Sequence, residues 1–324
     1  MFYHYCLGLV CKVCFKTVLA KYLLLFSVIF VKPRITTVVT MLTCWRRAVK
    51  VTDRQTFTGD NVNVLLCVVV GRGVRGVTLL HDIVYIVCEW SSSIIRFDAV
   101  THRRLADIIV KDMSQPRDIA ACQQTAQLYV AHHGCVWRVS SDGKEVKRLL
   151  PKSPSDTISP WALSVTSSRL LVTSHYTNQL RQFDAVGDEL SRVDLPRDMD
   201  PLHAVESPTG TFIVSHENTQ QLEYHVSEVD TGGQVLRQFS GSLFGFTPHV
   251  AVDSQGNIFV ADWGAGHILM LNSELTLRRV IIDEHQLNYN YKRPWRLCYT
   301  EQSGQLMVGF LNDRDVAVFD VLRR

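Results

Sequence analysis

This sequence of 324 residues lacks a strong net charge of either sign. Lysine and arginine number 34, aspartate and glutamate number 31, and the formal net charge is +3. A protein that binds nucleic acid mainly through phosphate contacts usually carries a clear basic excess or stripe. The charge balance therefore excludes a strongly basic nucleic-acid binder. Hydrophobic residues make up 46% of the chain, enough for a sizeable core.

Paired cysteine motifs are also missing. Of the nine cysteines, Cys11 and Cys14 have the spacing of a metal knuckle, but no second pair accompanies them, which argues against a structural zinc site. Single cysteines beside apolar runs, such as Cys88 and Cys122, are typical of free thiols in a reducing compartment. Since no Asn-x-Ser/Thr sequon occurs either, we predict a cytoplasmic protein.

A long apolar run is the third absence. Residues 22–31 form an uncharged run in the first fifty residues, but a membrane helix needs about 20 apolar residues. We interpret residues 1–50 as a leader, either poorly ordered or anchor-like, and Met41 as a possible natural start. A membrane role would require residues 18–31 to act as an anchor. The globular part is predicted over residues 51–324.

The clearest pattern in that part is a run of three short strands in residues 247–283. Pro248 precedes an apolar stretch, Gly256 lies in a polar turn, and residues 258–261 and 268–271 are two further β-rich stretches. The connections are too short for crossover helices, so the strands must pair as an antiparallel meander.

The same pattern recurs along the chain. Pro116, Pro160, Pro201, Pro248 and Pro294 are separated by 44, 41, 47 and 46 residues. A period of roughly 40 to 50 residues with about four short strands is typical of a β-propeller blade, whereas the hairpins of a sandwich would not keep this spacing. We predict an all-β, six-bladed β-propeller with blades near residues 74–112, 115–153, 159–196, 200–242, 247–283 and 293–324.

The last blade has no room for a fourth strand before Arg324. Residues 62–70 form an apolar strand that belongs to no blade, and an open ring would leave two exposed sheet edges. We therefore predict that residues 62–70 complete the last blade and close the ring. Gly71 to Gly76 match G-x-G-x-x-G, but a β-hairpin pattern follows instead of a helix, so we predict no dinucleotide site.

The unit that begins at Pro248 and includes Asp253, Gly256, Asp262 and His267 resembles the NHL repeat. The resemblance is specific in this fifth blade and looser in the others, where Asp262 is replaced by His132, Ser174, His216 and Phe310. In style it is similar to the propeller of the tripartite-motif NHL ubiquitin ligases. That resemblance implies a recognition domain for protein or RNA, without the RING and B-box, whose cysteine and histidine spacing is absent from residues 1–73.

An enzyme is the alternative that the resemblance leaves open. Six-bladed lyases that cleave peptidyl-hydroxyglycine hold zinc with Pro-His dipeptides. In this sequence Pro248-His249 fits that pattern, and Pro201-Leu-His203 is one residue out of step. His203 and His249 are therefore weak metal candidates. We predict no catalytic residues, no metal and no cofactor.

The prediction that remains is a binding module. Loops that follow the second strands and loops that enter the innermost strands share one face of a propeller, and aromatic and basic side chains gather in them. The predicted partner-binding residues are Arg72, Arg75, Trp90, Arg117, Trp161, Tyr176, Trp263, Tyr289, Tyr291, Lys292, Arg293, Trp295 and Arg314. Aromatic and arginine side chains serve both peptide and base-stacking interfaces. Because acidic residues share these loops, we rank a protein or peptide partner above RNA.

Overall fold

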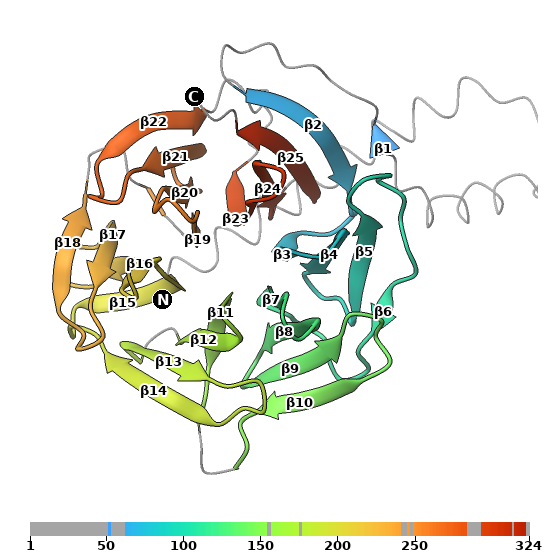
Figure 1. Ribbon diagram of the computed structural model, residues 1–324, viewed down its shortest axis with the longest axis horizontal. Coiled ribbons are helices and arrows are strands. Elements are labelled where there is room, and N and C mark those ends of the chain that lie inside the picture. The colour runs from blue at the N-terminus through green and yellow to red at the C-terminus, as the bar shows by residue number, and fades with distance from the viewer. Residues whose placement is uncertain are drawn as a thin grey trace, which may run out of the picture. The chain divides into compact units, whose positions relative to one another are not determined.

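The computed structural model describes residues 51–52, 62–153, 157–174, 177–240, 245–246, 249–283, 293–312 and 314–321. These residues form strands and loops arranged in six sheets around a central axis, which confirms the predicted six-bladed β-propeller (Figure 1). Within these ranges no helix is present, and so none that is long and apolar enough to cross a membrane. The predicted leader, residues 1–50, lies outside the described residues.

Every sheet is antiparallel, and in the first five the strand nearest the axis comes first along the chain (Figure 1). The first blade contains β3 (Val74–Leu80), β4 (Ile83–Cys88), β5 (Ser93–Asp98) and β6 (Ile108–Ile109). The second contains β7 (Asp118–Cys122), β8 (Gln127–His132), β9 (Cys135–Ser140) and β10 (Val146–Leu150). The third contains β11 (Pro160–Thr166), β12 (Arg169–Ser174), β13 (Gln179–Phe183) and β14 (Glu189–Asp194).

The fourth blade contains β15 (Met199–Glu206), β16 (Phe212–Asn218), β17 (Glu223–Val229) and β18 (Val235–Phe239). The fifth contains β19 (His249–Val252), β20 (Ile258–Asp262), β21 (His267–Leu271) and β22 (Leu277–Ile282). The sixth blade contains β23 (Pro294–Thr300), β24 (Gln305–Phe310) and β25 (Asp315–Val321), joined by β2 (Val62–Val69) and β1 (Val51–Thr52).

The ring closes as predicted, through β2. This strand pairs antiparallel with β25, from Val62 opposite Val321 to Val69 opposite Asp315. The backbone N–H of Val70 extends the ladder by donating to the carbonyl of Arg314 at 2.8 Å. The structure adds a strand that the sequence pattern did not predict, because β1 pairs with the outer side of β2 and makes the sheet five-stranded.

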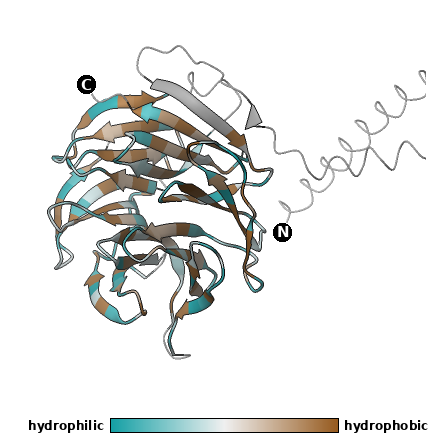
Figure 2. Ribbon diagram, turned by 45° about the vertical axis from the view of Figure 1, so that its right-hand side comes forward, coloured by the Kyte–Doolittle hydropathy of each residue, from teal (hydrophilic) through white to brown (hydrophobic). Residues whose placement is uncertain are grey.

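The core is divided into six apolar clusters, one between each pair of neighbouring blades. In β20, Phe259 and Ala261 belong to the cluster shared with the sixth blade, and Ile258 and Val260 to the cluster shared with the fourth. A strand buried on both faces needs apolar residues at successive positions, which explains the uninterrupted apolar runs of the second strands. Figure 2 shows the result, with hydrophobic residues concentrated along the strands and hydrophilic ones in the turns.

The closing strand generates a first prediction. A chain that begins at residue 74 lacks β2, so it exposes the edge of β25 and removes Val68 and Val70 from the cluster between the sixth and first blades. We expect it to lose most of the about 5–15 kcal/mol that stabilises a typical domain and to unfold or aggregate. Urea unfolding followed by circular dichroism measures the loss.

The control for this deletion is a chain that begins at residue 51, which keeps β1 and β2. We expect it to unfold cooperatively. Equal unfolding midpoints for the two chains would show that β2 is dispensable for closure.

Candidate functional site

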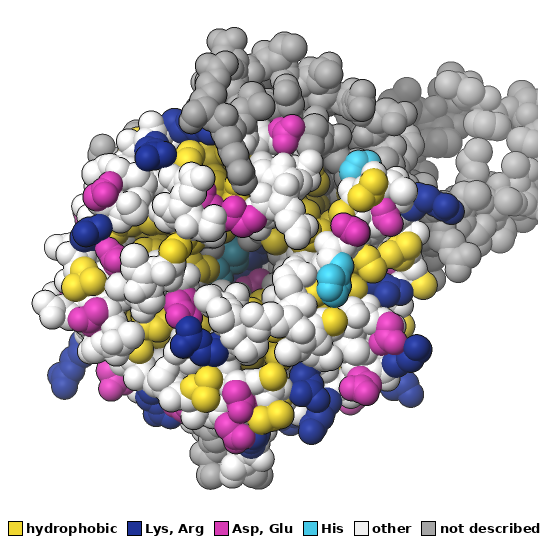
Figure 3. Space-filling model, viewed as in Figure 1, with side chains coloured by type: hydrophobic (Ala, Val, Ile, Leu, Met, Phe, Trp, Pro, Cys, Tyr) yellow, Lys and Arg dark blue, Asp and Glu magenta, His cyan; other side chains and the backbone are white. Residues whose placement is uncertain are grey.

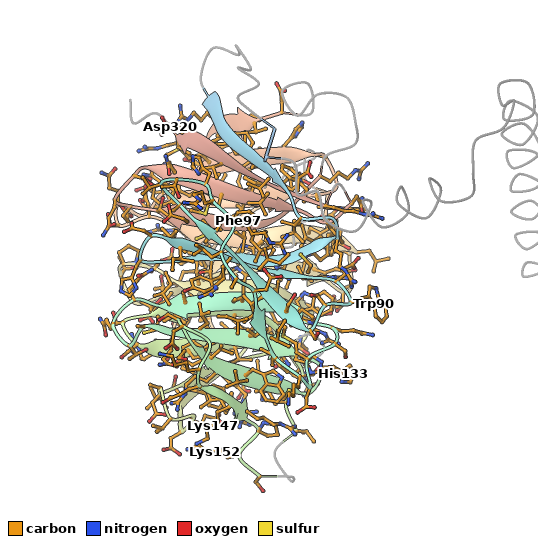
Figure 4. The ribbon with its side chains drawn as sticks, turned by 90° about the vertical axis from the view of Figure 1, so that its right-hand side faces the viewer. Trp90, Phe97, His133, Lys147, Lys152 and Asp320 are labelled. Carbon is orange, nitrogen blue, oxygen red and sulfur yellow. The ribbon has the colours of Figure 1, made fainter. Side chains whose placement is uncertain are left out.

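The predicted partner-binding residues that the structure describes lie in two sets of positions at one end of the ring. One set follows the second strands, and the other lies just before or at the start of the innermost strands. Trp90 follows β4 and His133 follows β8, and both lie at the same edge of the molecule (Figure 4). We call this end of the propeller the rim.

An aromatic cluster forms at the rim over the fifth and sixth blades. The rings of Phe246 and Trp295 are stacked with centroids 5.6 Å apart, and Trp263 meets Phe246 and Trp295 edge-on at 6.1 and 6.5 Å. Tyr224, from β17, meets Phe246 edge-on at 5.2 Å. These distances lie in the range in which aromatic pairs attract each other.

Asp262, the last residue of β20, holds together the two loops that carry this cluster. Its buried carboxylate accepts hydrogen bonds from the backbone N–H of Gly245 at 3.2 Å and of Ala265 at 2.9 Å. The loops touch so closely that a Cβ added to Gly264 would lie 2.4 Å from the Cα of Gly245. Glycine is therefore required at this approach, and the contact fixes Phe246 beside its aromatic neighbours.

Arginine side chains cover the cluster. The guanidinium carbon of Arg293 lies 4.8 Å from the centroid of Trp263, and those of Arg75 and Arg296 lie 5.6 and 5.2 Å from the centroid of Trp295. Such cation–π contacts fix the orientation of a guanidinium over an indole. The cluster thus brings together four residues that were predicted to bind a partner: Arg75, Trp263, Arg293 and Trp295.

The remaining described candidates lie apart from this cluster. Arg117 stacks over Trp161 at 5.2 Å and forms a separate pair. Arg72 donates to the backbone carbonyl of Trp90, whose side chain is exposed, and Arg314 is exposed at the start of β25. Tyr176, Tyr289, Tyr291 and Lys292 lie outside the described residues.

Sequence reasoning missed Phe246 and Tyr224 as members of the aromatic cluster. Phe246 stands two residues before Pro248, in a loop that leads into an innermost strand, so the rule used for the other residues could have found it. Tyr224 follows the short turn after β16 and reaches the cluster only through the packing of the fourth blade against the fifth. The sequence carries no signal for that contact.

At the axis, each innermost strand contributes one residue at an equivalent position. These residues pair with the same position of the second strand in every blade, and they are Gly76, Asp118, Ala162, His203, His249 and Arg296. Figure 3 shows a hollow at the centre of the ring with histidine, basic and acidic side chains at its base. We call these six residues the axial ring.

A buried ion pair crosses the axial ring from the second blade to the sixth. The Nε of Arg296 lies 3.3 Å from Oδ1 of Asp118, and Arg296 also donates to the backbone carbonyl of Arg117 at 3.2 Å. The other carboxylate oxygen of Asp118 accepts from Leu163 N–H at 2.9 Å. Burial raises the pKa of Asp118, although Arg296 and the backbone N–H groups oppose this shift.

The first blade makes room for this pair because its axial residue, Gly76, has no side chain. A Cβ at Gly76 would lie 2.6 Å from the backbone nitrogen of Ile119 and 3.0 Å from Oδ1 of Asp118. The glycine that resembled part of a dinucleotide fingerprint therefore has a packing role at the axis.

His203 and His249 stack in the axial ring with centroids 3.7 Å apart and an interplanar angle of 17°. A bulge in β15 between Pro201 and His203 brings His203 into register with His249, which removes the offset seen in the sequence. One ligand atom each of Asp118, His203 and His249 lie within 4.8 Å of one another, close enough to test as a metal site.

These residues do not fit a metal ion. The Nδ1 lone pairs of His203 and His249 accept from the backbone N–H groups of Val250 and Leu297, each at 3.3 Å, so each Nε2 carries the proton. Nε2 of His203 faces the carbonyl of Leu163 at 3.3 Å. A cation would also lie beside the guanidinium of Arg296, so we derive no metal chemistry at the axis.

Both axial histidines are held neutral. Burial and the nearby Arg296 lower the pKa of His203 to about 3, and burial together with His203 lowers the pKa of His249 well below its ordinary value. Within the described residues, the axial ring thus offers neither a charged general acid nor a free carboxylate. Its polar side chains fill the centre of the ring and connect the second, fourth, fifth and sixth blades.

A second concavity lies between the fifth and sixth blades, near the turn from β19 to β20. It has a volume of about 330 Å³ and is lined in part by Asp253, Asn257, Phe259 and Tyr299. The carboxylate of Asp253 already accepts from the side chain and backbone of Asn257, at 2.7 Å in each case. The polar groups of Asp253 and Asn257 therefore stabilise the turn from β19 to β20.

The axial ion pair generates a second prediction. Replacing Arg296 with methionine leaves Asp118 buried without its countercharge, and we expect a loss of about 3–5 kcal/mol in the free energy of unfolding. In the double variant Asp118→Asn with Arg296→Met neither charge remains, so its loss should be smaller than the sum of the two single losses. Urea unfolding of the four proteins gives the coupling energy, and additive losses would argue against the pair.

Buried histidines generate a third prediction. His216 and His225 face each other across β16 and β17 at 5.5 Å between centroids, and burial, with His225 nearby, lowers the pKa of His216 to about 4. Burial also lowers the pKa of His225. Because the unfolded chain takes up these protons near pH 6.5 and the folded chain does not, stability should fall as the pH drops below about 6.5.

For His216 the loss should be about 2 kcal/mol between about pH 7.5 and about pH 5, and His225 should add a loss in the same direction. Urea unfolding at the two pH values measures this loss in wild type and in His216→Gln with His225→Gln, which should lose less. His133→Gln, at an exposed position, is the matched control and should behave like wild type. An unchanged pH dependence in the double variant would contradict the assignment.

Comparisons with known proteins support the fold. No protein-family model matches the sequence, and no curated protein matches it. Solved structures do match. One is a catalytically inactive virginiamycin B lyase from Staphylococcus aureus with quinupristin, with a TM-score of 0.57, 13% identity, and coverage of 77% of this chain and 80% of that chain.

Two further structures are similar at the level of the fold. The WD40 β-propeller domain of Doa1 has a TM-score of 0.56 and 12% identity, and the match covers 82% of this chain and 99% of that chain. A chain in a nidogen/laminin complex has a TM-score of 0.53 and 14% identity, covering 66% and 81%. The chain is therefore a six-bladed β-propeller that is similar in fold to a lyase, to a WD40 propeller domain and to a chain of a protein complex.

Proposed function

We propose that this propeller is a non-catalytic recognition module that binds a protein or peptide segment at the rim, over the fifth and sixth blades. The observation that carries the proposal is the aromatic cluster of Phe246, Trp263 and Trp295 with Arg293 and Arg75 over the indoles. Tryptophan, tyrosine and arginine dominate the binding energy of protein interfaces. A fixed cluster of them loses little conformational entropy on binding.

The axial ring favours this function over an enzyme. A hydrolase or lyase needs a free general base, nucleophile or metal in reach of its substrate. Here Asp118 is neutralised by Arg296, and the lone pairs of both axial histidines accept backbone hydrogen bonds. A structure of similar fold also supports a binding role, since it is a complex of two proteins, nidogen and laminin.

By its resemblance to tripartite-motif NHL propellers, the module would serve as the substrate-recognition part of a ubiquitin ligase system, which would supply the catalytic domains on another polypeptide or segment. The mixed charge of the rim supports a protein partner over RNA. Glu89 forms an ion pair with Arg75, so part of the basic charge is already compensated.

The test is selection from a random peptide library on the immobilised protein. We expect wild type to enrich specific peptides, and Trp263→Ala with Arg293→Ala to weaken their binding about 30-fold or more, since truncating such residues typically costs about 2 kcal/mol. Leu277→Ala with Arg278→Ala, on the outer strand of the same blade, is the matched control and should bind like wild type.

Circular dichroism verifies that each variant remains folded. Equal binding of the peptides by the folded Trp263 and Arg293 variant would contradict a site at this cluster. If a random RNA pool, but no peptide, is enriched, and its affinity falls log-linearly with salt concentration, the module binds RNA instead.

A further inference from the structure

The aromatic cluster at the rim has more hydrogen-bond donors than acceptors. The indole N–H groups of Trp263 and Trp295 are buried and find no acceptor among the described residues, and Trp295 as a whole is only 6% exposed. A buried donor without an acceptor costs roughly 1–3 kcal/mol. Tryptophan can only donate, so these two groups call for an acceptor from elsewhere.

The two arginines over the indoles add to this excess. Arg293 donates through Nη1 to the carbonyls of Trp263 and Gly264, at 3.3 and 3.1 Å. Arg75 donates through Nη2 to Glu89. Each guanidinium carries five N–H donors, so most of the donors of both side chains are not engaged by other described residues.

The nearby acceptors are already engaged. The carbonyl of Phe246 accepts from the backbone N–H groups of Trp263 and Gly264, at 2.9 and 3.2 Å. Glu89 is paired with Arg75, and the carboxylate of Asp262 accepts from the backbone of the two loops. A ligand that fits this part of the rim therefore supplies acceptors and negative charge.

Two further acidic residues of the rim lie at the fourth blade. Asp198 precedes β15 and accepts from the side chain of Asn218 at 3.3 Å, and Glu217 lies near the end of β16. The rim is thus basic near Arg75 and Arg293 and acidic near Asp198 and Glu217. A ligand with acidic residues is attracted to the first region and repelled from the second, which fixes its position.

We propose that the segment recognised at the rim is an acidic peptide, whose aspartate or glutamate carboxylates accept hydrogen bonds from Arg75, Arg293 and the indoles of Trp263 and Trp295. This inference rests on the proposed function and specifies its ligand. Charge-assisted hydrogen bonds from arginine to carboxylate are short and about twice as strong as neutral ones. The indoles of Trp263 and Trp295 hold the guanidinium groups of Arg293 and Arg75 in place for such bonds.

The experiment compares the peptides that different proteins select from one random library. Wild type should enrich peptides with aspartate or glutamate, and exchange of these residues for asparagine or glutamine should weaken binding about tenfold or more by fluorescence anisotropy. Arg75→Glu with Arg293→Glu should reverse the preference toward lysine and arginine.

A matched control carries the same charge change away from the rim. Arg192→Glu with Arg237→Glu alters two outer strands, β14 and β18, and should select the same acidic peptides as wild type. If the rim charge reversal fails to fold by circular dichroism, Arg293→Gln replaces it, because among the described residues this side chain donates only to the backbone carbonyls of Trp263 and Gly264. That variant should weaken the acidic peptides about tenfold.

The outcomes separate the inference from the function on which it rests. Selected peptides that depend on Trp263 but bind equally well after loss of their carboxylates would overturn the acidic ligand and leave the recognition module intact. Selection of acidic peptides by all three proteins alike would also overturn it. Failure of wild type to enrich any peptide would overturn the proposed function itself.

Discussion

The structure depends on how six strands meet at one axis. Each innermost strand contributes a single residue to the axial ring, so a small residue in one blade leaves room for the larger side chains of its neighbours. Gly76 leaves the space in which Asp118 and Arg296 pair across the first blade. This pair joins the second and sixth blades, which are far apart in the sequence, and the stacked histidines join the fourth and fifth. The contacts at the axis therefore hold several blades together.

The fold could be predicted from the sequence because a propeller repeats. The proline spacing and the apolar second strands locate the six blades, and the absence of a fourth strand before Arg324 identifies residues 62–70 as the closing strand. The short strand β1 was missed, because two residues carry no periodicity. His203 was placed out of register because a bulge leaves no mark in the sequence that reveals its position.

The candidate site could be predicted only in part. The position of a residue within the blade repeat indicates the rim, which suffices to select Trp263, Arg293 and Trp295. It does not indicate which neighbours touch, because contacts such as Tyr224 to Phe246 depend on how two blades pack. The pattern that made His203 and His249 weak metal candidates likewise could not reveal that they stack on each other. Arg296 was missed because a second bulge places it, and not Trp295, at the axial position.

The closing pair of strands also determines how the ring responds to force. In the antiparallel ladder Val62 lies opposite Val321, so the start of β2 and the end of β25 lie side by side. A pull that separates these two strand ends loads the last residue pair of the ladder first, and the hydrogen bonds break one after another instead of sharing the load. The pairing of β2 with β25 is therefore the place where such a pull opens the ring.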